Sequence, residues 1–334
     1  MTMESGNISA VRETPDSNGQ YGVGVTDGGD FTMTGGKIEA GWFAVAGNGN
    51  YKTQNSIINI TDGELISTAD YAVYLPQSGT TTISGGKVYG AAGGVCIQRG
   101  TLNVEGTALI TSKGTGSTGN WGDGTGGLDC AAINVSGAYG IATVNIKGGT
   151  LIAEAKSLIT EGTTYTPVIN VTGGTFSDPS ALKYMATNAT VDIKLLSNIN
   201  IAKTELATGY ILNAANATAN LNLNGHDIIN SSETADATPF TQIFTVQNGT
   251  LNISGNGNVK CDASATAKDD GYRMVIEARG YGTVNIHGGS YYNTQKLNTQ
   301  IDLIYARENG KINIYGGTFE SGKYGTPNND TDGR

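Results

Sequence analysis

A short motif recurs along the chain, and this repetition constrains the fold more than any other feature of the sequence. Its fullest forms read VNIKGGTLI from Val144 and INIYGGTFE from Ile312. The copies begin at Met3, Met33, Ile58, Thr82, Leu102, Val144, Ile169, Leu251, Val284 and Ile312, and a variant, LNLNGHDII, begins at Leu221. The first two copies are 30 residues apart and the last two are 28 residues apart. A period of this size predicts a solenoid, in which each repeat packs only on its neighbours.

Each copy of the motif predicts two short strands joined by a tight corner. In Val144-Asn145-Ile146 the two aliphatic side chains point to one face of a strand and the amide points to the other. The Gly-Gly pair that follows supplies a positive φ for a corner. The next segment, such as 150–152, then forms the second strand.

A third apolar segment precedes many copies of the motif, as at 71–75, 94–97, 274–278 and 303–306. Three strands and three corners make one coil, and stacked coils form parallel sheets with right-handed crossovers. The predicted fold is therefore all-β, a right-handed parallel β-helix with three strands in each coil. The segments named here predict that Ala72, Val73, Val95, Ile97, Val275 and Ile304 lie in stacked parallel strands. Ile312 and Ile314 are predicted to be buried in the same way as Val144 and Ile146, with Asn145 and Asn313 pointing outward.

The repeat predicts one β-helix over residues 1–334, with an irregular coil around 178–220. There the pattern loosens, 178–184 could hold a helical turn, and 191–196 and 198–201 read as strands again. A domain junction in this segment is the alternative. Neither end of the chain shows a segment that would cap a solenoid, so we expect a fragment of a longer protein or a partner that covers the ends.

Composition excludes several classes of protein. The 50 glycines do not follow the every-third period of collagen. A net charge of −9 gives no general attraction for phosphate, so nucleic acid is not expected as a partner. No apolar run is long enough to predict membrane insertion. Three widely spaced cysteines do not make a disulfide framework, and Cys96 and Cys130 in apolar segments indicate buried thiols.

Three phrases together carry a resemblance: the VNIxGGTF repeats, VDIKLLSNINI from Val191, and LNLNGHDII from Leu221. They resemble β-helix proteins of tailed-phage virions and secreted surface proteins of gut bacteria, with the fold of the pectate-lyase-like superfamily. The resemblance extends over nearly the whole chain and is carried by structural residues. It implies a head fibre, capsid decoration or tail spike, often trimeric, that attaches to host or mucosal glycans.

The polar positions of the motif are amides rather than acids. The outward column comprises Asn59, Asn103, Asn145, Asn170, Asn222, Asn252, Asn285 and Asn313. Because Asn does not exchange a proton near neutral pH, we interpret the column as a ladder of side-chain hydrogen bonds rather than a binding comb. His226 and His287 are interpreted as corner residues, since neither has a triad-like environment. No catalytic residue or cofactor is predicted.

Acidic residues in the turns do not predict a metal site. The acids considered are Asp62, Asp123, Asp129, Asp269 and Asp270, and none belongs to a regular Ca²⁺-binding loop.

A small charged and aromatic patch is predicted near the end of the chain. Aligning the last two coils places Arg279 under Arg307, and Glu277 under Tyr305, with Glu308 beside them. A solvated ladder of charges is favoured over a site, but Arg279 and Arg307 are kept as candidate ligand-binding residues.

Four insertions predict a loop edge. They are 113–129, 230–239, 262–271 and 292–301, and we place each between the third strand of one coil and the first strand of the next. The insertion 113–129, which contains Trp121, is expected to add no core residue. Insertions on one edge of a solenoid usually form its binding face. The candidate ligand-binding residues there are Trp121, Asp123, Tyr272, Tyr291 and Tyr292. Aromatic rings can stack on sugar faces, while contact with sister subunits is the competing role for the loops.

The predicted function is therefore that of a non-enzymatic structural or attachment protein on a phage virion or a bacterial cell surface. We expect a surface glycan as ligand, and a homotrimer or other virion proteins as partners. The alternative is a polysaccharide lyase or glycoside hydrolase of the tail-spike depolymerase type, which would need paired acids across a surface groove.

Overall fold

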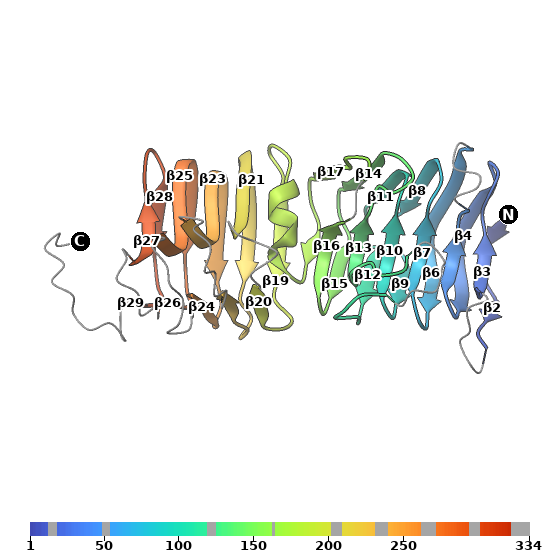
Figure 1. Cartoon of the computed structure of the whole chain (residues 1–334), viewed down its shortest axis with the longest axis horizontal. Helices are drawn as coiled ribbons and strands as arrows, with labels where there is room; N and C mark the ends of the chain where they lie inside the picture. Colours follow the sequence, from blue (N-terminus) through green and yellow to red (C-terminus); the bar gives the residue numbers. More distant parts are fainter. Residues whose placement is uncertain are drawn as a thin grey trace, which may run out of the picture. The chain divides into compact units, whose positions relative to one another are not determined.

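The computed structural model describes residues 1–12, 19–48, 54–118, 125–161, 164–201, 209–230, 240–261, 272–293 and 301–321. The chain divides into two compact units, Met1–Tyr184 and Met185–Arg334. This division falls inside the segment 178–220 that the sequence marks as irregular. Figure 1 shows each unit as a stack of short strands.

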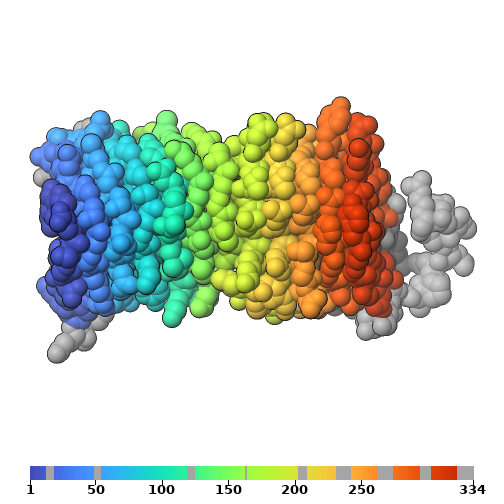
Figure 2. Space-filling model, turned by 180° about the vertical axis from the view of Figure 1, so that it is seen from behind, coloured from blue at the N-terminus to red at the C-terminus, as the bar shows by residue number. Residues whose placement is uncertain are grey.

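Three parallel ladders build the first unit, as the motif predicts. The motif ladder joins β1 (Thr2–Met3), β4 (Asp30–Ala40), β6 (Ser56–Ser67), β8 (Gly79–Ile83), β11 (Gly100–Val104), β14 (Ala142–Ile146) and β17 (Val168–Val171). After the glycine corner, the second ladder joins β2 (Asn7–Ala10), the distal halves of β4 and β6, β9 (Lys87–Gly90), β12 (Leu109–Ser112), β15 (Thr150–Ala153) and β18 (Thr175–Phe176). The third ladder joins β3 (Tyr21–Gly24), β5 (Phe43–Ala46), β7 (Tyr71–Leu75), β10 (Gly93–Ile97), β13 (Ala131–Val135) and β16 (Lys156–Thr160). In Figure 2 the successive coils of this unit appear as adjoining bands from blue to green.

The second unit repeats this plan. Its motif ladder joins β19 (Thr190–Lys194), β21 (Tyr210–Asn222), β23 (Phe240–Ser254), β25 (Tyr272–Ile286) and β28 (Lys311–Ile314). The long strands β21, β23 and β25 also contain the third strand of their coils, which β27 (Ile301–Ala306) continues. The other ladder joins β20 (Ile199–Ile201), β22 (Ile228–Asn230), β24 (Asn258–Cys261), β26 (Ser290–Asn293) and β29 (Thr318–Ser321). At the end of the first unit a 3₁₀ helix, η2 (Pro179–Tyr184), confirms the helical turn expected in the irregular segment. None of the helices in the described ranges is long and apolar enough to cross a membrane.

The predicted fold is confirmed: the named ladders are parallel, and aliphatic columns form the core. Val73, Val95 and Ile133 pair in register and are buried. Val144 and Ile146 are buried, and Asn145 between them is only partly covered. Each coil therefore places its aliphatic residues on those of the coil beneath, and apolar burial is the main force that holds the stack together.

The burial predicted for Ile312 and Ile314 is wrong. Ile312 is half-buried, and Ile314 exposes 53% of its surface. Strand β28 pairs with β25, and no further motif strand pairs with it among the described residues. A residue in the core of a solenoid is covered by a coil on each side. Among the described residues, Ile312 and Ile314 are covered only by the coil that contains β25.

Glycine corners follow the motif strands as expected. Gly149 has a φ of +80°, and a Cβ at this position would lie 2.9 Å from the Ala108 carbonyl oxygen of the coil beneath. Both the left-handed conformation and the close stacking of corners therefore require glycine.

The insertion at 113–129 packs back on the protein, which corrects the expectation that it adds no core residue. An antiparallel bridge joins Ser117 to Asp129, Thr125 is fully buried, and its hydroxyl donates to Asp70 Oδ2 at 2.9 Å. Leu128 packs against a cluster made by Trp42, Phe43, Ala46, Tyr71, Tyr74 and Cys96. Strands β7, β10 and β13 are buried at every position, which is typical of strands covered on both faces. The prediction of buried thiols at Cys96 and Cys130 is confirmed, and Cys261 is buried as well.

Replacing Ile146 tests the aliphatic column. Ile146→Asp places an unpaired charge in a packed interior, so we expect loss of the cooperative unfolding transition of the first unit, measured by circular dichroism. Ile146→Val is the matched control, with an expected cost of about 1 kcal/mol for one lost methyl group. An Ile146→Asp protein that melts like the wild type would contradict the register.

Candidate functional site

The asparagine ladder is present in both units. In the first unit Asn145 Nδ2 donates to Asn103 Oδ1 at 3.0 Å, and Asn170 Nδ2 donates to Asn145 Oδ1 at 3.0 Å. In the second unit the side chains of Asn220, Asn252, Asn285 and Asn313 form the same chain, with N···O distances of 2.8 Å. Each interior amide thus donates to one coil and accepts from the next. The prediction of a hydrogen-bonded ladder is confirmed for these residues, whereas Asn59 lies in register between Thr32 and Thr82 and has no amide neighbour in its column.

One rung of the predicted ladder is wrong. Asn222 pairs in register with Ser254, whereas Asn220 pairs with Asn252. The apolar positions of this coil are therefore Ala219 and Leu221, which lie against Leu251 and Ile253. Aligning LNLN from Leu221 with LNIS from Leu251 makes Asn222 the partner of Asn252. This assignment lies two residues beyond the true partner, Asn220.

The histidines occupy corners, as expected. The ring of His287 stacks on Tyr315, with centroids 4.7 Å apart and an interplanar angle of 8°. The backbone N–H of His226 donates to the Leu223 carbonyl oxygen at 2.9 Å in a turn.

The acids considered for a metal site do not come together in the described ranges. Asp62 accepts a hydrogen bond from the N–H of Gly63 at 2.7 Å. Over those ranges no group of three or more His, Cys, Asp or Glu side chains could hold a metal ion. Asp123, Asp269 and Asp270 lie outside the described residues.

Only part of the predicted loop edge can be placed. Trp121 and Asp123 lie outside the described residues, as does the side chain of Tyr272. Tyr292 is half-buried in β26.

Tyr291 requires a correction, because it is a core residue rather than a loop aromatic. Its side chain is fully buried, stacks on Phe319 with centroids 5.0 Å apart, and donates to the Gly288 carbonyl oxygen at 2.9 Å. Burial also raises the pKa of its phenol. The ring is therefore not available to stack on a ligand.

The insertions leave their coils at a corner different from the one predicted. They follow the second strand of a coil and precede the third, as between β12 and β13. In the second unit the last strand residues before the insertions are Asn230, Cys261 and Asn293, and these pair in register. Three successive insertions therefore begin at one stacked corner of this unit.

A charged corner forms at the other end of the third strand. We use this name for Glu277, Arg279, Arg307 and Glu308. Glu277 is 2% exposed, and its carboxylate lies 2.7 Å from Arg307 Nε and 4.0 Å from Arg279 Nε. Glu277 pairs in register with Tyr305, as predicted. The structure thus brings Arg279 and Arg307 together around a buried carboxylate, where the sequence favoured a solvated ladder.

Further contacts link the residues of the charged corner to one another and to their neighbours. Gln242 Nε2 lies 3.5 Å from Glu277 Oε2, and Arg307 Nη1 lies 3.2 Å from Glu308 Oε1. Glu308 adopts a left-handed conformation with a φ of +58° and accepts a hydrogen bond from the N–H of Gly280 at 3.0 Å. The hydrogen bond to Glu277 is the main cause that raises the pKa of the Arg307 guanidinium. Arg307 therefore stays charged and links two adjacent coils.

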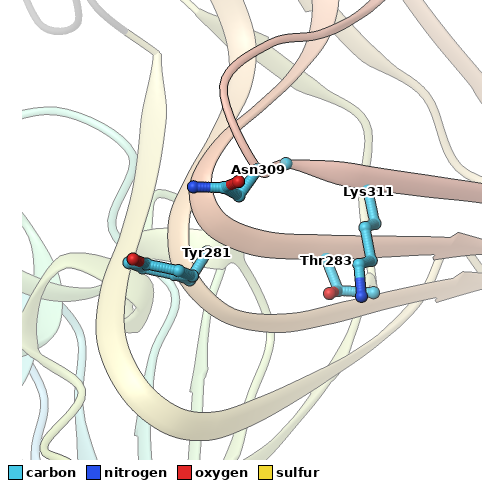
Figure 3. A pocket seen from close by; sticks show the side chains of 5 residues that line it. Tyr281, Thr283, Asn309 and Lys311 are labelled. Atoms are coloured by element: carbon cyan, nitrogen blue, oxygen red, sulfur yellow. The ribbon is translucent and has the colours of Figure 1, made fainter.

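A pocket of about 490 Å³ adjoins the charged corner. We call it the tyrosine pocket, and its lining residues are Tyr281, Thr283, Asn309, Gly310 and Lys311. Figure 3 shows the Tyr281 ring on one side, the side chains of Thr283 and Lys311 together on the other, and Asn309 between them. Tyr281 exposes 76% of its surface. An aromatic face beside amide, hydroxyl and ammonium groups can bind a small polar ligand that has one apolar face.

No protein-family model matches the chain, and no curated protein or solved structure matches it either.

The two arginines allow a matched test of the charged corner. Arg307→Leu removes the 2.7 Å hydrogen bond to a buried carboxylate, so we expect the free energy of unfolding of the second unit to fall by about 2 kcal/mol. Arg279→Leu removes only the 4.0 Å contact and should cost about 0.5 kcal/mol. Urea unfolding measures both, and equal costs would contradict the assignment of Arg307 as the main partner of Glu277.

Proposed function

We propose that this chain is a non-enzymatic structural and attachment protein, displayed on a phage virion or a bacterial cell surface. The observation that carries the proposal is the asparagine ladder. Asn145 both donates to and accepts from its neighbours in the coils on either side, so these outward polar groups are used to hold coils together. An outer surface built from mutually bonded amides is suited to a durable scaffold.

The stacked insertions support the attachment role. In the second unit they begin at Asn230, Cys261 and Asn293, which are neighbours in one ladder. Successive insertions from one corner can contact one extended ligand at several points, and several weak contacts add up to strong attachment. A surface glycan is such a ligand.

The carboxylates of the charged corner also favour attachment over catalysis. A glycosidase uses two carboxyl groups that exchange protons or attack the sugar. Glu277 lies between two guanidinium groups, and Glu308 is paired with Arg307 and with the N–H of Gly280. The carboxylates of Glu277 and Glu308 thus form contacts that stabilise the fold, and this favours a structural role for them over catalysis.

The motif resemblance to β-helix proteins of tailed phages and gut bacteria agrees with a display role. It also leads us to propose a trimer or an assembly with other virion proteins.

A glycan array followed by product analysis tests the proposal. We expect the purified chain to retain at least one surface glycan, and mass spectrometry to recover that glycan intact after long incubation. Shortened or unsaturated products would overturn the proposal and establish a depolymerase instead.

Trp121 tests whether the insertion of the first unit contributes to attachment. Trp121→Ala should weaken binding to the glycan found on the array, because an aromatic ring that stacks on sugar is lost, and the melting temperature of each variant separates a lost contact from a damaged fold. Trp121→Tyr is the matched control and should retain most of the binding. Unchanged binding by Trp121→Ala would remove this residue from the attachment site.

A further inference from the structure

The tyrosine pocket is built by residues that depart from the repeat. In the second unit the residue just before the first apolar position of the motif strand is threonine in four successive coils. These residues, which pair in register, are Thr190, Thr218, Thr250 and Thr283. The next residue in this column is Lys311, which pairs with Thr283. The stack does not need an ammonium group here, since threonine fills the same position in the coils beneath.

A second column is interrupted at the same place. Asn248 Nδ2 donates to Asn213 Oδ1 at 2.6 Å, as in the main ladder. The next residue in this register is Tyr281, which has no amide to continue the chain of hydrogen bonds. Asn309 precedes Lys311 by the same two residues that separate Tyr281 from Thr283. Tyr281 therefore ends the column of bonded amides that begins with Asn213 and Asn248. Its ring is exposed to solvent.

Lys311 also differs from three lysines of the first unit that form ion pairs. Lys37, Lys87 and Lys147 lie within 4.0 Å of Glu39, Glu64 and Glu105, respectively. Within the described part of the chain the ammonium group of Lys311 forms no ion pair. Two guanidinium groups and two carboxylates make up the adjoining charged corner, so Lys311 leaves a net positive charge on this surface of an otherwise acidic protein.

The turn that carries Asn309 and Gly310 is held by contacts within the protein. A Cβ on Gly310 would clash with the Ala278 carbonyl oxygen, so the turn packs directly on the coil beneath. The turn is also held by Glu308, through Arg307 and the N–H of Gly280. A turn that is held in this way places Asn309 in the pocket without a backbone rearrangement on binding.

From these observations we infer that the tyrosine pocket is a binding site for an anionic saccharide, a sugar that carries a carboxylate or a sulfate. The apolar face of the sugar ring stacks on Tyr281. The acidic group lies at the ammonium group of Lys311. The amide of Asn309 and the hydroxyl of Thr283 bond to sugar hydroxyls. The site rests on glycan attachment as the proposed function, and it lies at a different corner from the insertions.

Variants that restore the repeat test this site without harming the fold. Lys311→Thr and Tyr281→Asn each install the residue found one coil beneath, and both should melt at or above the wild-type temperature. Tyr315→Ala is the matched control, because Tyr315 is exposed and lies outside the pocket. The probes are a glucuronate-containing oligosaccharide, a sulfated oligosaccharide of the same length, and the corresponding neutral glucose oligosaccharide.

Calorimetric titration of the full chain should show binding of at least one anionic probe and markedly weaker binding of the neutral one. Lys311→Thr should weaken anionic binding about tenfold, which corresponds to the loss of one charge-assisted hydrogen bond, and added salt should weaken it in the wild type. Tyr281→Asn should weaken it by a similar factor, and Tyr315→Ala should leave it unchanged. The preferred probe identifies the acidic group as carboxylate or sulfate.

Two results would overturn the inference: equal binding by Lys311→Thr and wild type, or binding of neither anionic probe. If Lys311→Thr and Tyr281→Asn bind the anionic probes as the wild type does and still bind the glycan found on the array, the pocket is excluded while the attachment role stands. Cleavage of a probe would contradict the attachment role, and the effect of the two variants on its binding would still decide the pocket.

Discussion

In-register parallel pairing is the constraint on which the rest of each unit depends. It places a residue of one coil directly on its counterpart in the next, about 4.8 Å away. An aliphatic residue then packs on an aliphatic residue, as Val73 does on Val95, and an amide bonds to an amide, as Asn145 does to Asn103. The same charge repeated along such a column would meet like charges, so amides are the polar groups best suited to identical repetition. Stability and surface chemistry are thus set by the same columns.

The fold could be predicted from the sequence because two independent signals agree. Alternation around Asn145 indicates a strand with one buried face, and the glycine pair at 148–149 indicates the corner that follows. The sequence pattern did not determine the register of β21, where the first apolar position of the motif is an alanine. Ala219 occupies the position of Leu251. Because Leu221 and Leu223 match the apolar pattern better than Ala219 does, the sequence alignment was shifted by two residues. Pairing between coils, which no single segment encodes, decides between the two registers.

The candidate site was predicted only in part. Arg279 and Arg307 could be placed together from the 28-residue offset of the last two coils, but the burial of Glu277 between them depends on the surrounding packing. Tyr291 looked like a loop residue because it adjoins an insertion, whereas its position in β26 directs it inward. The tyrosine pocket was missed, although its signal is present in the sequence. Tyr281 and Lys311 replace the residues that their columns otherwise contain, and this becomes visible only once the columns are aligned correctly.

Cross-linking across the corrected rung tests the in-register account most directly. Neighbouring outward residues on paired parallel strands lie close enough for a disulfide. Asn220→Cys combined with Asn252→Cys should therefore form a disulfide under mild oxidation, quantified by mass spectrometry. Asn222→Cys combined with Asn252→Cys should not, and the native thiols at Cys96, Cys130 and Cys261 are buried and give a low background. Efficient cross-linking of the 222–252 pair and none of the 220–252 pair would contradict the register, and with it the columns from which the tyrosine pocket is inferred.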